Sequence, residues 1–320
     1  MKKIILRILS VILLAIALVG CVQKENTDFK DTMKSDDKIS IVATIFPQYD
    51  FTRAIVGDKA DLTMLIKPGG ETHSYDPSPG DIIKIQNADV FIYIGGENDE
   101  WVNTILESMD TSNKKIIRLM DSVRAVEEET IEGMETEEHD HEEEVEYDEH
   151  IWTSPKNAIL MINAITDIIC EMDGRNADTY KQNAAAYTAQ IQEVDNEITE
   201  IVDHATHKLL VFGDRFPFRY FADEFGLDYR AAFNGCSTET EASAATLAYL
   251  IDTVKKNNMS HIFYIELSNQ NIAKVISEQT GAKMLLLHSC HNVSKDDFQA
   301  GATYLSLMKQ NAAHLRKGLN

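Results

Sequence analysis

The sequence lacks several features that would point to common classes of protein. Its most apolar segment, Ile8–Val19, is shorter than the roughly 20 residues that a transmembrane helix needs. Only 30 basic residues stand against 52 acidic ones, with no basic patch, which argues against nucleic acid as a partner. The ATP-binding pattern Gly-x-x-x-x-Gly-Lys-Ser/Thr and the zinc-hydrolase pattern His-Glu-x-x-His are also absent.

Cysteine is scarce, and the first of the four cysteines ends a recognisable segment. Two lysines and the apolar run precede Leu18-Val19-Gly20-Cys21, which has the form of a secretory signal that ends in a lipobox. We expect residues 1–20 to be a lipoprotein signal peptide and Cys21 to carry the lipid. The polar residues 21–38 then predict a flexible tether. This interpretation places the rest of the chain outside the cytoplasmic membrane, anchored to it by lipid.

The other three cysteines are Cys170, Cys236 and Cys290. An extracellular location permits a disulfide but does not require one, and the odd number leaves at least one thiol free. The sequence leaves two states open for Cys236 and Cys290: a disulfide between them, or two free thiols. A thiolate ligand to a metal is less favoured, because an exposed thiolate outside the cell is easily oxidised. Cys170 is interpreted as a core residue.

Charge is concentrated in one segment. Residues 127–149 contain fourteen acidic residues and no lysine or arginine, and the rest of the chain accounts for only −8 of the net −22. We expect this run to be a solvated, disordered tract. It also contains His139 and His141, which predict a weak auxiliary metal site that raises the local cation concentration.

Strand-like and helix-like segments alternate along the chain, which predicts an α/β fold with parallel sheets. The longest periodic segment has an apolar residue every three or four positions over about Asn176–His204, as expected for one long helix. The fold class is therefore α/β, with two lobes, each a mostly parallel sheet flanked by helices, joined by one long rigid helix. The predicted divisions are an N-terminal lobe at 39–175, the connecting helix at 176–206 and a C-terminal lobe at 207–320.

Three histidines lie where a strand or loop ends. His73 follows the predicted strand Leu62–Ile66 in a loop rich in glycine and proline, and His288 directly follows the apolar run Met284–Leu287. His150 precedes Ser154-Pro155, which predicts a helix start. Each histidine alone is as well explained by a structural role. Together, from two lobes, they could meet in the cleft as neutral imidazole ligands of Zn²⁺.

Four segments carry a resemblance to a known family, the ZnuA-like lipoproteins that bind zinc or manganese for metal ABC transporters. They are Pro68-Gly-Gly-Glu-Thr-His-Ser-Tyr-Asp-Pro-Ser-Pro79, Ala88–Gly96 followed by Glu100-Trp101, Asp148-Glu-His-Ile-Trp-Thr-Ser-Pro155, and Glu241-Ala-Ser-Ala-Ala-Thr-Leu247. In the third, the family usually has proline before the histidine and Leu-Asp after the tryptophan. The likeness extends over about 39–315. It implies metal held between two α/β lobes, an ABC permease and its ATPase subunit as partners, and a monomeric receptor.

The resemblance implies His73, His150 and His288 as metal ligands, and it shows one departure. The turn after the first strand of the C-terminal lobe usually carries a histidine or glutamate ligand, and here that position falls on Gly213 or Arg215, neither of which binds a cation. Asp214, Glu239 or water could complete the ligand set. Nitrogen ligands favour zinc, whereas manganese prefers carboxylates. An acidic, histidine-containing insertion is typical of the zinc-type members.

Three functions are compared against these sequence features. The favoured hypothesis is an extracytoplasmic receptor that captures Zn²⁺, or alternatively Mn²⁺, and delivers it to a membrane permease. On this hypothesis, we expect the protein not to be an enzyme. A secreted zinc hydrolase is the second, because three histidines and an open position also describe catalytic zinc. No general base stands beside a ligand pair to support it. Cell adhesion is a possible side activity that leaves the histidines unexplained.

Overall fold

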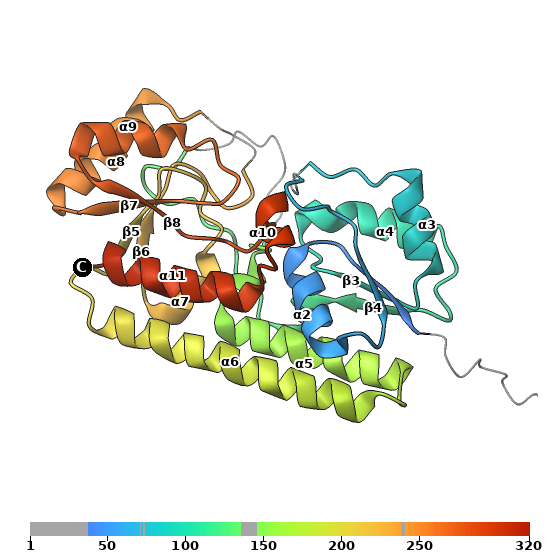
Figure 1. The fold of residues 1–320 in the computed structure, drawn as a ribbon. Coiled ribbons are helices and arrows are strands. Elements are labelled where there is room, and N and C mark those ends of the chain that lie inside the picture. Colours follow the sequence, from blue (N-terminus) through green and yellow to red (C-terminus); the bar gives the residue numbers. More distant parts are fainter. Residues whose placement is uncertain (1–37, 71, 73, 136–145, 238–240) are drawn as a thin grey trace, which may run out of the picture. The chain divides into compact units, whose positions relative to one another are not determined.

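The computed structural model describes residues 38–320, except 71, 73, 136–145 and 238–240. Lys38–Asn320 forms one compact unit (Figure 1). Within the described residues, no helix has both the length and the apolar character needed to cross a bilayer. The predicted signal peptide, the predicted lipid attachment at Cys21 and the predicted tether up to residue 37 lie outside the described residues. The division of the chain into lobes at the stated boundaries stays a prediction.

The N-terminal sheet has four parallel strands in the order β2-β1-β3-β4. They are β1 (Ser40–Ala43), β2 (Asp61–Met64), β3 (Val90–Tyr93) and β4 (Lys115–Arg118). The central strand β3 is buried along its whole length, as expected for a strand covered by helices on both faces. Strand β2 lies within two residues of the predicted strand Leu62–Ile66.

The C-terminal half contains two parallel strand pairs, β5 (Leu209–Val211) with β6 (Asp228–Arg230) and β7 (His261–Tyr264) with β8 (Lys283–Leu286). A parallel bridge between Phe212 and Phe263 joins the pairs, which gives the strand order β6-β5-β7-β8. The predicted fold class is confirmed. Strand β6 was not predicted, because three residues that include Asp228 and Arg230 show no apolar run.

The helices begin and end largely where their sequence signals indicate. Ser78, Ser154, Ser243, Ser294 and Thr303 each accept a backbone N–H in the first turn of the helix that follows. The α-helices are α2 (Phe46–Val56), α3 (Pro79–Asn87), α4 (Glu100–Glu107), α5 (Pro155–Met172), α6 (Ala177–Asp203), α7 (Arg219–Phe225), α8 (Ala244–Lys256), α9 (Asn271–Thr280), α10 (Lys295–Gln299) and α11 (Tyr304–Gly318).

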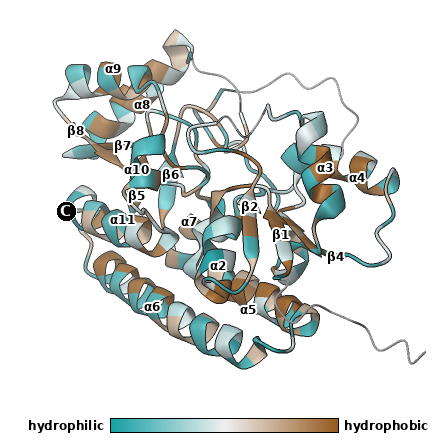
Figure 2. Cartoon of the chain, turned by 45° about the vertical axis from the view of Figure 1, so that its right-hand side comes forward, coloured by the Kyte–Doolittle hydropathy of each residue, from teal (hydrophilic) through white to brown (hydrophobic). Residues whose placement is uncertain are grey.

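The long helix α6 has 27 residues and packs against α2, α5 and α11, so it contacts elements from both halves of the chain (Figure 1). Its apolar residues form one buried stripe, and the hydropathy colours in Figure 2 alternate around its surface accordingly. The predicted connecting helix is therefore confirmed. Because one face is buried along most of its length, α6 is a rigid support rather than an isolated linker.

The N-cap of α9 is Gln270, in a left-handed conformation (φ 62°), and the Ser268 hydroxyl accepts the N–H of Gln270.

One local prediction was wrong in part. The acidic run is not a disordered tract at its ends. Glu127 forms an antiparallel bridge with Tyr147, and Met134 is buried. Hydrogen bonds and apolar packing order both ends of the run, and its centre lies outside the described residues.

Both sheets reverse their strand order next to their first strand, between β1 and β3 and between β5 and β7. Crevices beyond the carboxyl ends of the strands at such points are the usual ligand sites of open α/β sheets. The segments that follow these strands carry the histidines considered next.

Candidate metal centre

Among the candidate ligands that the structure describes, His150 is the most buried, with no exposed surface. It lies just before the short 3-10 helix η3 (Ile151–Thr153). Its backbone N–H donates to Asp148 Oδ1 at 2.8 Å, and its Nδ1 lies 3.1 Å from the same oxygen. A carboxylate on Nδ1 holds the ring in the tautomer that presents Nε2 as a ligand, the arrangement seen behind many zinc-bound histidines.

The environment of His150 favours positive charge. Burial alone would lower the pKa of His150, but the adjacent carboxylate of Asp148 outweighs it, so the net pKa is raised above the ordinary 6.5. Burial raises the pKa of the neighbouring Glu149 to about 7. A buried imidazole among carboxylates is therefore a place where a cation is stabilised.

Three hydrogen bonds fix the segment around His150. Tyr220 donates to Asp148 O at 2.7 Å, and Tyr304 donates to Trp152 O at 2.8 Å. The indole N–H of Trp152 donates to Ser289 O at 2.8 Å. The last bond ties the His150 segment, from the N-terminal half, to the loop that follows β8 in the C-terminal half.

His291, in that loop, packs directly against His150. The two ring centroids are 5.2 Å apart, nearly perpendicular, and His291 also lies 5.0 Å from the Trp152 ring. The Oγ1 of Thr72 is 3.4 Å from His291 Nδ1. The sequence prediction missed His291 and chose His288 from the same His-Ser-Cys-His segment. The second histidine of that motif was the signal that could have indicated it.

The loop that leads to His73 is held on the same surface. Asn292 Nδ2 donates to Lys67 O at 3.0 Å and to Gly70 O at 2.8 Å. The Gly69 N–H donates to Val293 O at 2.7 Å. His73 itself lies outside the described residues, as do Glu239, His139 and His141, and their roles as ligands stay predictions. The bonds show that the chain just before His73 is attached to the loop that carries His291.

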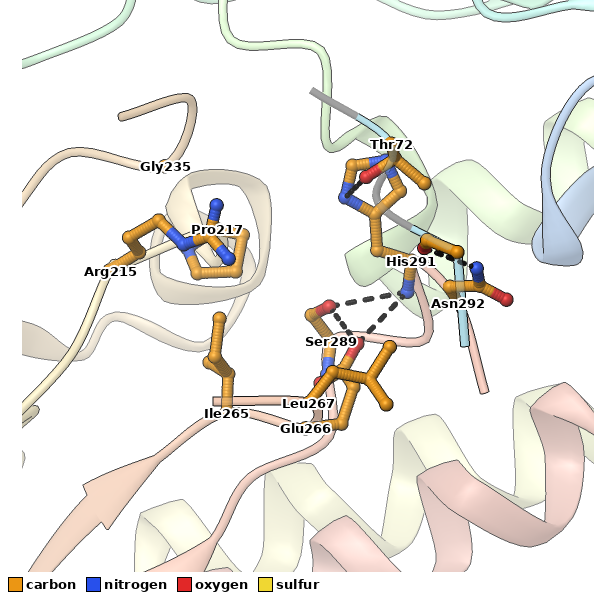
Figure 3. Close-up of a pocket in the computed structure, with 11 residues that line it drawn as sticks. Thr72, Arg215, Pro217, Gly235, Ile265, Glu266, Leu267, Ser289, His291 and Asn292 are labelled. Atoms are coloured by element: carbon orange, nitrogen blue, oxygen red, sulfur yellow. Dashed lines mark hydrogen bonds between the residues drawn. The ribbon is translucent and has the colours of Figure 1, made fainter. Parts of the chain in front are cut away.

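A small cavity of about 50 Å³ opens beside this cluster. Figure 3 shows Thr72, Ser289, His291 and Asn292 on one side of it and Arg215 and Pro217 on the other, with Glu266 near its base. Its lining comes from the loops after β2, β5, β6, β7 and β8. The cavity thus lies where the sheet topology places a ligand site.

His288 takes a different position in the same loop. Its Nδ1 accepts the N–H of Cys290 at 2.9 Å and lies 3.5 Å from a carboxylate oxygen of Glu266. Asn311 on α11 accepts the His288 N–H and donates to its carbonyl oxygen, both at 2.7 Å. These bonds attach His288 to α11, and its role as a metal ligand stays a prediction.

The turn after β5 shows why the position of Gly213 carries no side chain. A Cβ on Gly213 would lie 2.5 Å from Ala273 Cα and 2.6 Å from its nitrogen, so any larger residue would displace α9. Asp214 accepts the N–H groups of Arg215 at 2.9 Å and Ile265 at 3.4 Å, and burial raises the pKa of Asp214. Asp214 thereby stabilises the turn, and its role as a ligand stays a prediction.

Arg215 Nη1 donates to Ser237 O at 3.1 Å, which holds the loop next to His150. That loop contains Gly235, where a Cβ would lie 3.1 Å from His150 Nδ1. Cys236 follows, and its N–H donates to Glu128 Oε1 at 3.2 Å. Cys236 and Cys290, for which the sequence left a disulfide open, are both free thiols, as is Cys170, which packs against the core.

Fold and site together define a class of protein: two parallel α/β sheets joined by a long rigid helix, with a buried histidine cluster suited to a metal ion between them. Comparison with known families agrees with this class. Residues 41–318 match the family described as "Zinc-uptake complex component A periplasmic", and the chain belongs to this family.

Among its relatives, the chain is 34% identical over 322 aligned positions to the zinc-binding lipoprotein AdcA of Streptococcus pneumoniae. That alignment covers 99% of this chain and 61% of AdcA, so the chain spans about three fifths of the length of that relative. It is 31% identical to the high-affinity zinc uptake system protein ZnuA of Bacillus subtilis, over 88% of both chains. The solved Zn(II)-bound ZnuA-like domain of Streptococcus pneumoniae AdcA superposes with a TM-score of 0.74 at 32% identity and covers 88% of this chain and 99% of that domain.

Proposed function

We propose that this protein is the extracytoplasmic zinc receptor of an ABC importer, and not an enzyme. The observation that carries the proposal is His150, a fully buried imidazole with Asp148 on Nδ1, packed against His291 at the junction of the two halves. Relatives named for zinc binding and zinc uptake support zinc as the cargo. Neutral imidazoles suit Zn²⁺ better than Mn²⁺, which prefers sites richer in carboxylates.

The proposal includes the rest of the transport system. An ABC permease and its ATPase subunit would take the ion from this receptor and supply the energy. A lipid on Cys21 would hold the receptor at the outer face of the membrane, which agrees with relatives that are named lipoproteins. We propose a monomeric receptor, with His73 as a ligand from the loop that Asn292 holds.

The test is a chelator-competition titration of the metal-free protein with Zn²⁺ and Mn²⁺. His139→Ala and His141→Ala are introduced together, so that the auxiliary histidines do not add a second site. We expect one tight zinc per chain, with manganese at least about a hundredfold weaker, which corresponds to about 2.7 kcal/mol. His150→Ala should abolish tight binding. Equal affinities for the two metals, or tight zinc binding by His150→Ala, would refute the proposal.

A further inference from the structure

We infer that Cys236 and Glu149 bind the zinc ion together with His150, so that the receptor holds its cargo with a thiolate. This inference rests on the proposed function and identifies the residues of its site. One ligand atom from each of the three residues lies within 4.8 Å of the others. Zinc binds sulfur at about 2.3 Å and nitrogen or oxygen at about 2.0–2.2 Å, so small side-chain movements would bring all three atoms to one ion.

The chain positions these three residues from both halves of the protein. Glu149 and His150 are adjacent in the segment that Tyr220 and Trp152 fix. Cys236 reaches them from the loop after β6, which Arg215 holds through Ser237. A Cβ on Gly235 would lie 3.1 Å from the imidazole of His150, so this glycine brings the Cys236 loop close against the ring. A metal at this point would therefore join the two halves.

The carboxylates around the three residues favour a bound cation. Asp148 and Glu149 are buried, with 2% and 4% of their surface exposed. Glu128 bonds to the Cys236 N–H and interacts electrostatically with His150. A buried group of carboxylates is costly unless positive charge accompanies it. A divalent ion bound by Glu149, His150 and Cys236 would supply that charge at the centre of the group.

Only the thiolate form of cysteine is a metal ligand. Zinc binding at Cys236 forms a Zn–S bond, and the thiol proton passes to the solvent.

The experiment uses the complete chain, stripped of metal and titrated with Co²⁺ and then with Zn²⁺. Cobalt bound to a thiolate gives a sulfur-to-metal charge-transfer band in the near ultraviolet. We expect this band in the unaltered protein and in Cys290→Ser, the matched control, but not in Cys236→Ser. Zinc affinity of Cys236→Ser should fall at least about a hundredfold, and at pH 7 this variant should release one proton fewer per zinc bound. Circular dichroism of each variant confirms folding.

Glu149→Gln tests the carboxylate separately, because it should retain the cobalt band while its zinc affinity falls at least about tenfold. Tight zinc binding without a cobalt band in the unaltered protein would overturn the inference while the proposed function stands. A band that persists in Cys236→Ser, or an unchanged zinc affinity in Glu149→Gln, would also overturn it. Failure of the unaltered protein to bind either metal would refute the proposed function and the inference together.

Discussion

Tyr187, in the middle of α6, donates its hydroxyl to Asp50 Oδ2 of α2 at 2.7 Å. Asp50 is buried, and the same oxygen accepts the N–H of Tyr304 at the start of α11 at 2.9 Å. Arg53 pairs with the other oxygen at 2.7 Å. One carboxylate therefore connects three helices, and α11 also bears Asn311, which holds the loop of the metal site.

The first prediction concerns this connection. Tyr187→Phe removes the hydroxyl from a buried carboxylate and should lower the free energy of unfolding by about 1–3 kcal/mol. Urea unfolding followed by circular dichroism measures the change. Tyr147→Phe is the matched control, because Tyr147 is 50% exposed, and it should change stability by less than about 0.5 kcal/mol. Equal stabilities of the two variants would contradict the structural role of the Tyr187–Asp50 bond.

The second prediction concerns Asn292, which donates two hydrogen bonds to the loop before His73. At about 1 kcal/mol for each bond, Asn292→Ala should weaken zinc binding by up to roughly 30-fold, because the loop must then be ordered at the expense of binding energy. Chelator competition measures the loss. Asn113→Ala, at an exposed position, is the control and should bind zinc as the unaltered protein does. An unchanged affinity in Asn292→Ala would show that the loop contributes nothing to the site.

The third prediction concerns pH and stability at Glu224 on α7. Burial raises the pKa of Glu224 from 4.5 to about 7, although Ser154 donates a hydrogen bond to it. The folded protein therefore binds this proton more tightly than the unfolded chain. Its contribution is fully present below about pH 4.5 and is lost as the pH rises to about 7.

Glu224→Gln cannot ionise, so its stability should decline less than that of the unaltered protein between pH 5 and pH 8. The difference should approach about 1.4 kcal/mol for each unit of pKa shift. Urea unfolding of the metal-free proteins at both pH values gives the comparison. Glu193→Gln, at an exposed position of α6, should follow the unaltered protein. Parallel pH profiles for Glu224→Gln and the unaltered protein would rule out the raised pKa.

The fourth prediction concerns pH and zinc affinity. His150 binds metal only when its imidazole is neutral, and Asp148 raises its pKa above 6.5 despite burial. The fall in zinc affinity on acidification should therefore become steeper from a pH above 6.5. Asp148→Asn removes the charge, lowers the pKa of His150 and should move the onset of this fall to lower pH. Its zinc affinity at pH 8 should also drop about 10–100-fold, because the amide holds the ring less well. An onset that does not move would exclude Asp148 as the controlling group.

Much of the fold could be predicted from the sequence because its elements are local. The Ser154-Pro155 start of α5, the apolar stripe of α6 and the strand runs each need only a few neighbouring residues, and the structure confirms them. The exceptions were segments with weak local signals. Strand β6 has three residues and forms through pairing with β5, and the N-cap of α9 is set by the backbone at Gln270 rather than by a serine.

The same distinction between local signals and tertiary contacts applies to the candidate site. The sequence predicted His150 as a ligand from its place before a helix start, and this stays a prediction. By itself the sequence determined the fold class and the long helix, because periodicity and helix capping are properties of short segments. Only the tertiary structure decided that His291 packs on His150, that Gly213 has no room for a side chain, and that Cys236 lies beside Glu149. Those relationships join residues separated by dozens to more than a hundred positions. Packing between the two halves determines such distances, and no local pattern encodes them.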